Sequence, residues 1–164
     1  MLATATLVAA TVAMGLFAGL FWSFAVAVMP GLRQVSDRTF VEAMQRINVA
    51  IVNPVFLLVF LGAPVLTIVA GALQLGTDDR APLPWIVAGF VLSAAAFVAT
   101  VAVNIPLNNA LDAAGPPDQA GDLAGVRERF ESRWVRWNIV RAVTSTAAFA
   151  CLCWALLLYG RAAA

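Results

Sequence analysis

Long apolar runs, separated by short polar stretches, account for most of this chain of 164 residues. Each run has about 20 residues or more, enough for a helix to cross a hydrocarbon core about 30 Å thick. Only helices and closed barrels satisfy their backbone hydrogen bonds in lipid, and uninterrupted runs of this length fit helices. The pattern predicts an all-α fold, an integral membrane four-helix bundle, as a single membrane domain over residues 1–164. The predicted spans cover residues 4–29, 55–75, 83–103 and 139–159.

Two of the polar stretches have helical periodicity. In the first loop, apolar residues recur every three or four positions: Phe40, Met44, Ile47 and Ile51. This stripe predicts a short amphipathic helix at the membrane interface. In the third loop the same spacing starts at Leu123 and predicts a second short interfacial helix that begins near Asp118. Asn53 followed by Pro54 is typical of a helix cap with proline in the first turn.

Small residues occupy every fourth position of the first run: Thr11, Gly15, Gly19, Ser23 and Ala27. Such a stripe lets another helix approach closely in a membrane. Packing within one bundle is the interpretation we favour. The alternative is a homo-oligomer that forms through the Gly15 and Gly19 face.

The charges predict an orientation. The chain is 62% hydrophobic by count and has a formal net charge of +1, which suggests no nucleic acid partner. Its basic residues are all arginine, and most of them lie in the first and third loops. Basic loops stay on the cytoplasmic side, so we expect a multi-pass plasma membrane protein with loops 1 and 3 cytoplasmic and both termini outside. No basic residue precedes the first run, which predicts a retained span rather than a cleaved signal.

Polar residues gather at one depth of the predicted bundle, at the cytoplasmic ends of the spans. They are Asn48, Asn53, Asn104, Asn108, Asn138 and Arg141, with Trp134 and Trp137 as a lid. Asn104 and Asn108 share a face if the helix persists through Pro106. Polar groups within spans are rare and tend to face the bundle interior, so together these residues predict a polar pocket.

Each of these residues also has a simpler role available. Asn53 has the sequence context of a cap, and Asn104 has the carbonyl of Ala102, freed by Pro106, as a partner. Arg141 has the length to snorkel to lipid phosphate, and the two tryptophans fit an interfacial belt. The joint occurrence at one level makes the pocket the better interpretation.

The residue types limit the chemistry of such a pocket. The chain has no histidine, and its two cysteines, Cys151 and Cys153, lie toward the other end of the fourth span. These facts argue against zinc, copper or haem held by the usual ligands, and no phosphate-binding or dinucleotide motif occurs. We therefore expect no metal and no cofactor. Hydrogen-bond donors, one cation and flat aromatic walls suit an oxyanion or enolate on a planar apolar molecule.

Four segments carry a family resemblance that extends over nearly the whole chain. They are V-M-P-G-L at 28–32, F-V-E-A-M-Q-R-I-N at 40–48 with N-P at 53–54, N-I-P-L-N at 104–108 and W-x-x-W-N-x-x-R at 134–141. Together they resemble the anthrone oxygenase-like family of small integral membrane proteins. The resemblance implies cofactor-independent oxidation of an anthrone to an anthraquinone by O2, which would make the chain an oxidoreductase.

The resemblance also suggests roles for the pocket residues. Arg141, with Asn104 or Asn108, would hold the oxyanion, and Glu42 or a water would act as the base. Trp134 and Trp137 would stack on the rings. The remaining pocket residues would contact the substrate: Asn48, Asn53 and Asn138.

Two other functions compete with this one. The first is a non-catalytic membrane subunit that binds a lipid, a quinone or another lipophilic small molecule. The second is a small transporter, which the absence of charge at the centre of the first three spans argues against.

Overall fold

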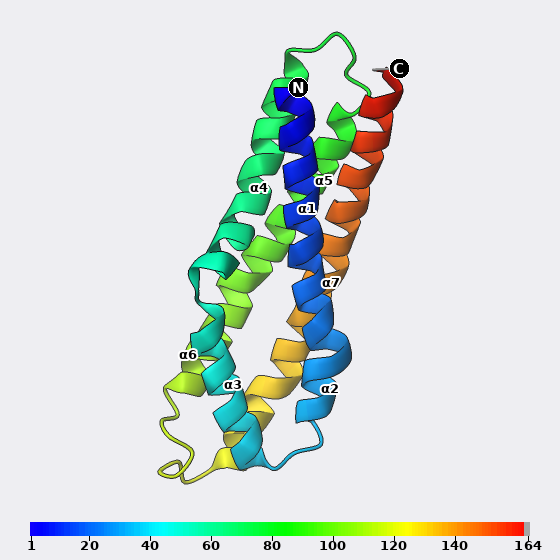
Figure 1. Ribbon diagram of the computed structural model, residues 1–164. Helices are drawn as coiled ribbons and strands as arrows, with labels where there is room; N and C mark the ends of the chain where they lie inside the picture. The colour runs from blue at the N-terminus through cyan, green and yellow to red at the C-terminus, as the bar shows by residue number, and fades with distance from the viewer. Residues whose placement is uncertain (163–164) are drawn as a thin grey trace.

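The computed structural model describes residues 1–162, and these residues form a bundle of helices without any strand (Figure 1). Four continuous helices are long and apolar enough to cross a membrane. They cover Leu2–Leu32, Pro54–Leu75, Leu83–Asp112 and Leu123–Arg161. The predicted all-α fold with four spans is confirmed. By the length and composition of these helices, the chain is a multi-pass membrane protein.

Two of the spans contain one wide, π-helical turn ahead of a proline. The first span consists of α1 (Leu2–Ser23), η1 (Phe24–Val28) and α2 (Met29–Leu32). The third consists of α5 (Leu83–Ala99), η2 (Thr100–Asn104) and α6 (Ile105–Asp112). Proline lacks the N–H that continues the helix, and a local π-turn lets a membrane helix accommodate it. The third helix therefore continues through Pro106 to Asp112, well past the end of its apolar run.

The helix predicted in the first loop is α3 (Asp37–Ile51). Ser36 caps α3, because its hydroxyl accepts a hydrogen bond from the N–H of Thr39 at 3.2 Å. Figure 1 shows α3 below α4 (Pro54–Leu75), running along the bundle rather than across it. Its apolar side is buried against α6 and α7, so α3 extends the bundle beyond the second span.

The last element, α7 (Leu123–Ala162), is one helix of 40 residues that runs the length of the bundle (Figure 1). The helical stretch predicted in the third loop is its first part and is continuous with the fourth span. At 3.6 residues per turn, residues seven apart share a face. Trp134 and Arg141 have this spacing, and the unbroken helix preserves it.

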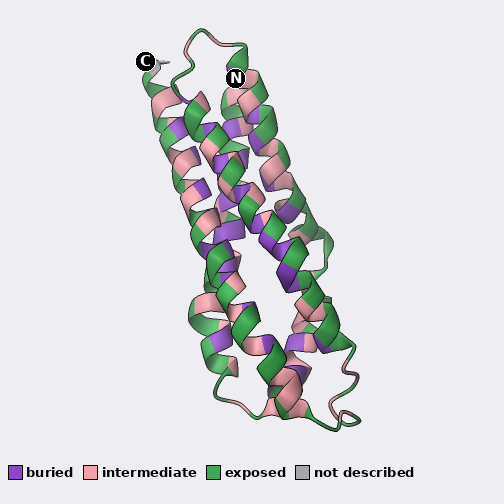
Figure 2. Cartoon of the chain, turned by 180° about the vertical axis from the view of Figure 1, so that it is seen from behind, coloured by how far each residue is buried: buried purple, intermediate pink, exposed green. Residues whose placement is uncertain are grey.

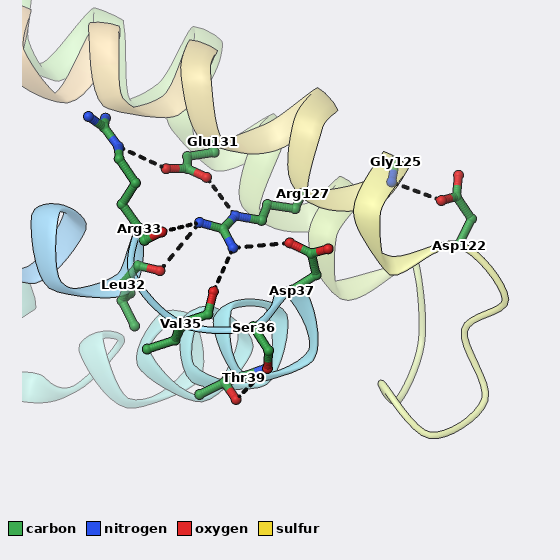
Figure 3. Close-up of polar contacts among 10 residues, drawn as sticks. All are labelled: Leu32, Arg33, Val35, Ser36, Asp37, Thr39, Asp122, Gly125, Arg127 and Glu131. Atoms are coloured by element: carbon green, nitrogen blue, oxygen red, sulfur yellow. Dashed lines mark hydrogen bonds and ion pairs between the residues drawn. The ribbon is translucent and has the colours of Figure 1, made fainter.

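An arginine of α7 fastens the lower end of the bundle to the first loop (Figure 3). The guanidinium of Arg127 donates to the carboxylates of Glu131 at 2.7 Å and Asp37 at 3.0 Å. It also donates to three backbone carbonyls of the loop, those of Leu32, Arg33 and Val35. One side chain of α7 thus contacts the loop that leads into α3 at several points.

Two apolar clusters fill the bundle. The upper cluster joins the four spans, and Met14, Ala63 and Leu152 lie in it. The lower cluster surrounds α3 and includes Phe40 and Met44. Figure 2 shows buried residues on the inward side of the helices and exposed residues on the outward side. Many of the exposed residues are large and apolar, as expected for a surface that faces lipid.

The N-terminus and the last described turn of α7 lie at the same end of the bundle (Figure 1). Figure 1 shows the N-terminus near the end of α7, and the first and third loops at the opposite end of the bundle. Loops 1 and 3 therefore share one side, as the sequence predicted.

The small residues of the first span have different surroundings. A Cβ added to Gly15 would lie 3.0 Å from a ring carbon of Phe149 on α7, so this position packs within the bundle. A Cβ added to Gly19 meets nothing within 4 Å. At Gly15, α1 therefore packs closely against α7 of the same chain. The homo-oligomer stays a prediction.

Candidate functional site

A cavity of about 240 Å³ lies between the two apolar clusters. Residues of all four spans and of α3 line it. The polar ones are Asn48, Thr100, Asn104, Asn108, Trp134 and Arg141. Most of the others are aromatic or aliphatic, and they include Phe21, Phe24, Phe56 and Phe60. The pocket is therefore an apolar chamber with polar groups concentrated on the α5–α6 and α7 side.

Arg141 is buried in the wall of this cavity and is only 5% exposed. Its guanidinium carbon lies 4.3 Å from the ring centroid of Phe21 and 5.3 Å from that of Trp134. Its Nη1 donates to the hydroxyl of Thr100 at 3.4 Å. The ion pairs among the described residues involve four other arginines, and none involves Arg141. The site thus contains a buried cation between aromatic faces without a carboxylate partner.

Asn138 holds Arg141 in this position from behind. Its carbonyl oxygen accepts a hydrogen bond from Nη2 of Arg141 at 2.9 Å, and its amide donates to the backbone carbonyl of Phe21 at 3.1 Å. Asn138 is fully buried and does not line the cavity. Asn138 contacts Arg141 rather than the cavity, and its second hydrogen bond links α7 to α1.

The wide turn η2 brings the two asparagines of the third span into the cavity wall. The amide of Asn104 donates to the backbone carbonyl of Trp134 at 3.3 Å. The indole N–H of Trp134 donates to Oδ1 of Asn108 at 2.8 Å. Because the helix persists through Pro106, both asparagines face α7. The carbonyl of Ala102 is not the partner of Asn104.

Three buried polar atoms around the cavity lack a hydrogen-bond partner among the described residues. They are Nδ2 of Asn48, Oδ1 of Asn104 and Nε of Arg141. Leaving such an atom unpaired costs about 1–3 kcal/mol. Two donors and one acceptor are therefore available to a molecule bound here.

Besides Asn138, three residues that the sequence placed in the site lie outside the cavity lining. Asn53 is exposed and caps α4, accepting from the N–H of Phe56 at 3.0 Å. Trp137, three residues after Trp134, is half-buried and is not among the residues that line the cavity. Glu42 faces another surface depression and pairs with Arg46 at 2.8 Å, so it is not near the buried cation.

Sequence reasoning missed part of the wall. Thr100 was detectable in principle, because it is a polar residue inside an apolar span, four residues before Asn104. Phe21 was not, because the first span is apolar throughout and no pattern separates this phenylalanine from its neighbours. Its position under Arg141 depends on tertiary packing.

The described residues contain no group of three or more His, Cys, Asp or Glu side chains arranged to hold a metal ion. The fold and the site together define a class: a four-span membrane protein with an apolar chamber and one buried, unpaired guanidinium. The chain belongs to the anthrone oxygenase family, whose model matches residues 55–151, more than half of the sequence. Neither the curated proteins nor the solved structures contain a match to this chain.

The matched range carries most of the cavity chemistry, including Thr100, Asn104, Asn108, Trp134 and Arg141. The segments at 28–32 and 40–48, which also carried the resemblance, precede it. Phe21 and Asn48 therefore complete the site from outside the matched range.

Proposed function

We propose that this protein binds a planar, lipophilic aromatic compound of the anthrone class as its anion and oxidises it with O2. The observation that carries the proposal is the state of Arg141. A desolvated cation costs several kcal/mol unless an opposite charge lies close by. No described residue supplies that charge, and a bound enolate oxygen would.

The dimensions of the cavity support a single compact ring system. Its volume of about 240 Å³ lies below the range of about 300–1,000 Å³ typical of sites for larger ligands. Its walls include Phe21, Phe24, Phe56 and Trp134, whose flat faces suit a fused aromatic molecule. Arg141 lies at the polar side of this chamber, where an oxygen substituent on the ring would meet it.

The reaction needs an acidic carbon and O2. Loss of a proton from the methylene carbon of an anthrone leaves an anion whose charge is shared with the carbonyl oxygen. This anion gives one electron to O2, and the resulting radical and superoxide combine through a carbon–oxygen bond. The peroxide takes up a proton. Its O–O bond then breaks as the remaining hydrogen leaves the same carbon, which gives the quinone carbonyl and one molecule of water.

The chamber favours the first step by stabilising the anion. None of the described residues that line it is acidic, and Glu42 is directed elsewhere. A positive charge and unpaired donors lower the pKa of a bound acid. We therefore assign the ionisation to the electrostatic effect of Arg141, with the amide of Asn48 as a second donor and water as the proton acceptor.

A direct assay tests the proposal. Purified protein in detergent is mixed with anthrone in air, and quinone absorbance and O2 uptake are followed together. Equal molar amounts of O2 consumed and quinone formed are expected, and Arg141→Gln should lose this activity. Arg136→Gln is the matched control, because Arg136 lies on the same helix but is exposed. Equal turnover in wild type and Arg141→Gln would contradict the assignment.

A second function is favoured by the lack of an acidic residue in the described lining. A chamber without its own base suits a protein that holds an anionic aromatic compound or a quinone without converting it. Binding of anthrone that depends on Arg141, with no O2 uptake, would select this binding function over oxidation.

The distribution of arginines supports an orientation for the whole molecule. Loops 1 and 3 carry most of the basic residues, so we place them on the cytoplasmic side of the plasma membrane with both termini outside. The cavity would then lie toward the cytoplasmic leaflet. Reporter fusions at either terminus test this orientation, and a reporter active in the cytoplasm would contradict it.

A further inference from the structure

The residues that line the cavity are buried on one side and exposed on the other. Arg141, Asn104 and Trp134, on its inner side, are almost completely buried. Among the residues that line it, only Val52, Leu57 and Ile105 are exposed. All three of these are aliphatic.

The exposed residues belong to two segments. Val52 and Leu57 flank the junction of α3 and α4, and Ile105 begins α6. At the junction the helix is interrupted, since Asn53 is extended and α4 starts again at Pro54. Figure 2 shows this junction as exposed. Across the exposed part of the cavity from this junction, the wide turn η2 ends at Asn104. Irregular backbone therefore borders the cavity on this side.

The other directions are filled. Below the cavity, toward the loops, the lower cluster includes the fully buried side chains of Phe40, Met44 and Leu111. Above it, the upper cluster continues with Ala63 and Ala96. A molecule cannot reach Arg141 from either end of the bundle without displacing these side chains.

We propose that the cavity opens sideways into the bilayer, through a lateral entrance bordered by Val52, Leu57 and Ile105. The inference rests on the proposed function, because the molecule that would use the entrance is its lipophilic aromatic ligand. Leu57 and Ile105 lie within helices that are long and apolar enough to cross a membrane, and we therefore place the opening at membrane depth. The ligand enters from the acyl chains, crosses an aliphatic rim and meets the cation last.

The first experiment tests the entrance without any ligand. A nitroxide is attached at Ile105→Cys, in protein lacking both native cysteines and reconstituted in phosphatidylcholine vesicles. O2, which is enriched in lipid, should relax the label more than a water-soluble nickel chelate does. Stronger relaxation by the nickel chelate would place the rim in water and overturn the proposal.

The second experiment tests passage through the entrance. Leu57→Trp narrows the rim, whereas Leu58→Trp adds the same bulk at the neighbouring position, which is 73% exposed and does not line the cavity. Anthrone is added to the vesicles, and its association is followed by stopped-flow fluorescence. We expect Leu57→Trp to slow association about tenfold, within the range over which related complexes vary, and Leu58→Trp to leave it unchanged.

Other results would decide against the entrance. Equal association rates for wild type and Leu57→Trp would overturn it while leaving the anthrone site intact. Slowing by Leu20→Trp alone would move the opening to α1 and would overturn it as well. If wild type binds no anthrone, the proposed function fails, and the nitroxide measurement still decides whether the rim faces lipid.

Discussion

Two arginines of α7, Arg127 and Arg141, lie about four turns apart and have opposite environments. Arg127 has a side chain only 13% exposed, yet it contacts two carboxylates, three backbone carbonyls and the ring of Phe40 at 4.5 Å. Arg141 is more deeply buried and has one asparagine, one threonine and two aromatic rings. Arg127 has its charge neutralised within the chain, whereas Arg141 does not.

This difference separates a structural cation from a candidate functional one. A saturated guanidinium has no hydrogen-bonding capacity left for a ligand, and its removal exposes the groups that it satisfied. An unpaired buried guanidinium contributes little to folding, because its desolvation opposes whatever it gains. The two residues therefore predict opposite patterns of lost stability and lost activity.

The largest effect is expected for Arg141→Met. Anthrone oxidation should fall by about 100- to 1,000-fold, the usual result of losing one preorganised donor to a developing oxyanion. The melting temperature in detergent should be unchanged or higher, because an apolar side chain of similar length replaces a buried charge. A large drop in melting temperature would show that Arg141 is structural, like Arg127.

Arg127→Met should show the reverse. We expect the free energy of unfolding to fall by about 3 kcal/mol, because Glu131 and Asp37 lose their partner. Denaturant titration monitored by tryptophan fluorescence measures this change. Turnover per folded molecule should stay near that of wild type, and a selective loss of turnover would contradict the structural role.

Asn138→Asp is designed to make Arg141 resemble Arg127. The new carboxylate would neutralise the guanidinium from behind, so the affinity for an anionic ligand should fall about tenfold, equivalent to about 1.4 kcal/mol. Binding of neutral anthraquinone should change little. Fluorescence titration with both compounds measures the difference, and an equal loss for both would point to a disturbed cavity rather than to charge.

The smallest effect is expected for Asn108→Ala. It removes the acceptor of the Trp134 indole and should cost about 1 kcal/mol of stability, as for one neutral hydrogen bond. Activity should fall only a fewfold through the altered position of the indole. Calorimetry and the quinone assay measure the two effects, and a loss as large as that of Arg141→Met would assign Asn108 a direct part in the reaction.

Much of the fold followed from the sequence, because apolar runs long enough to cross a bilayer have few alternatives. The extension of the third helix to Asp112 did not follow, since Pro106 suggested an end where a π-turn carries the helix through. The depth of polar residues predicted which groups meet at the cavity, including Asn48, Asn104 and Arg141. The depth of a residue along a span does not determine which way its side chain points around the helix axis.

The side-chain direction, which the sequence did not give, explains why some predicted site residues do not line the cavity. Glu42 lies six residues before Asn48 on α3, nearer the loops, and it is not on the apolar stripe, so it pairs with Arg46 at another surface depression. Trp137 lies about 60° from Trp134 around α7 and does not line the cavity. Phe21 lies under the guanidinium through packing between α1 and α7, and no local pattern encodes such a contact.

The wide turn η2 determines which side chains of the third span line the pocket. It contains one residue more than an α-helical turn closed by the usual hydrogen bonds, and one residue corresponds to a rotation of about 100°. Everything beyond it, Asn108 included, is turned by that amount relative to α5. Removing a single residue from this turn would re-aim the far half of the wall without altering any of its side chains, so the chamber can acquire a new lining by a change in chain length alone.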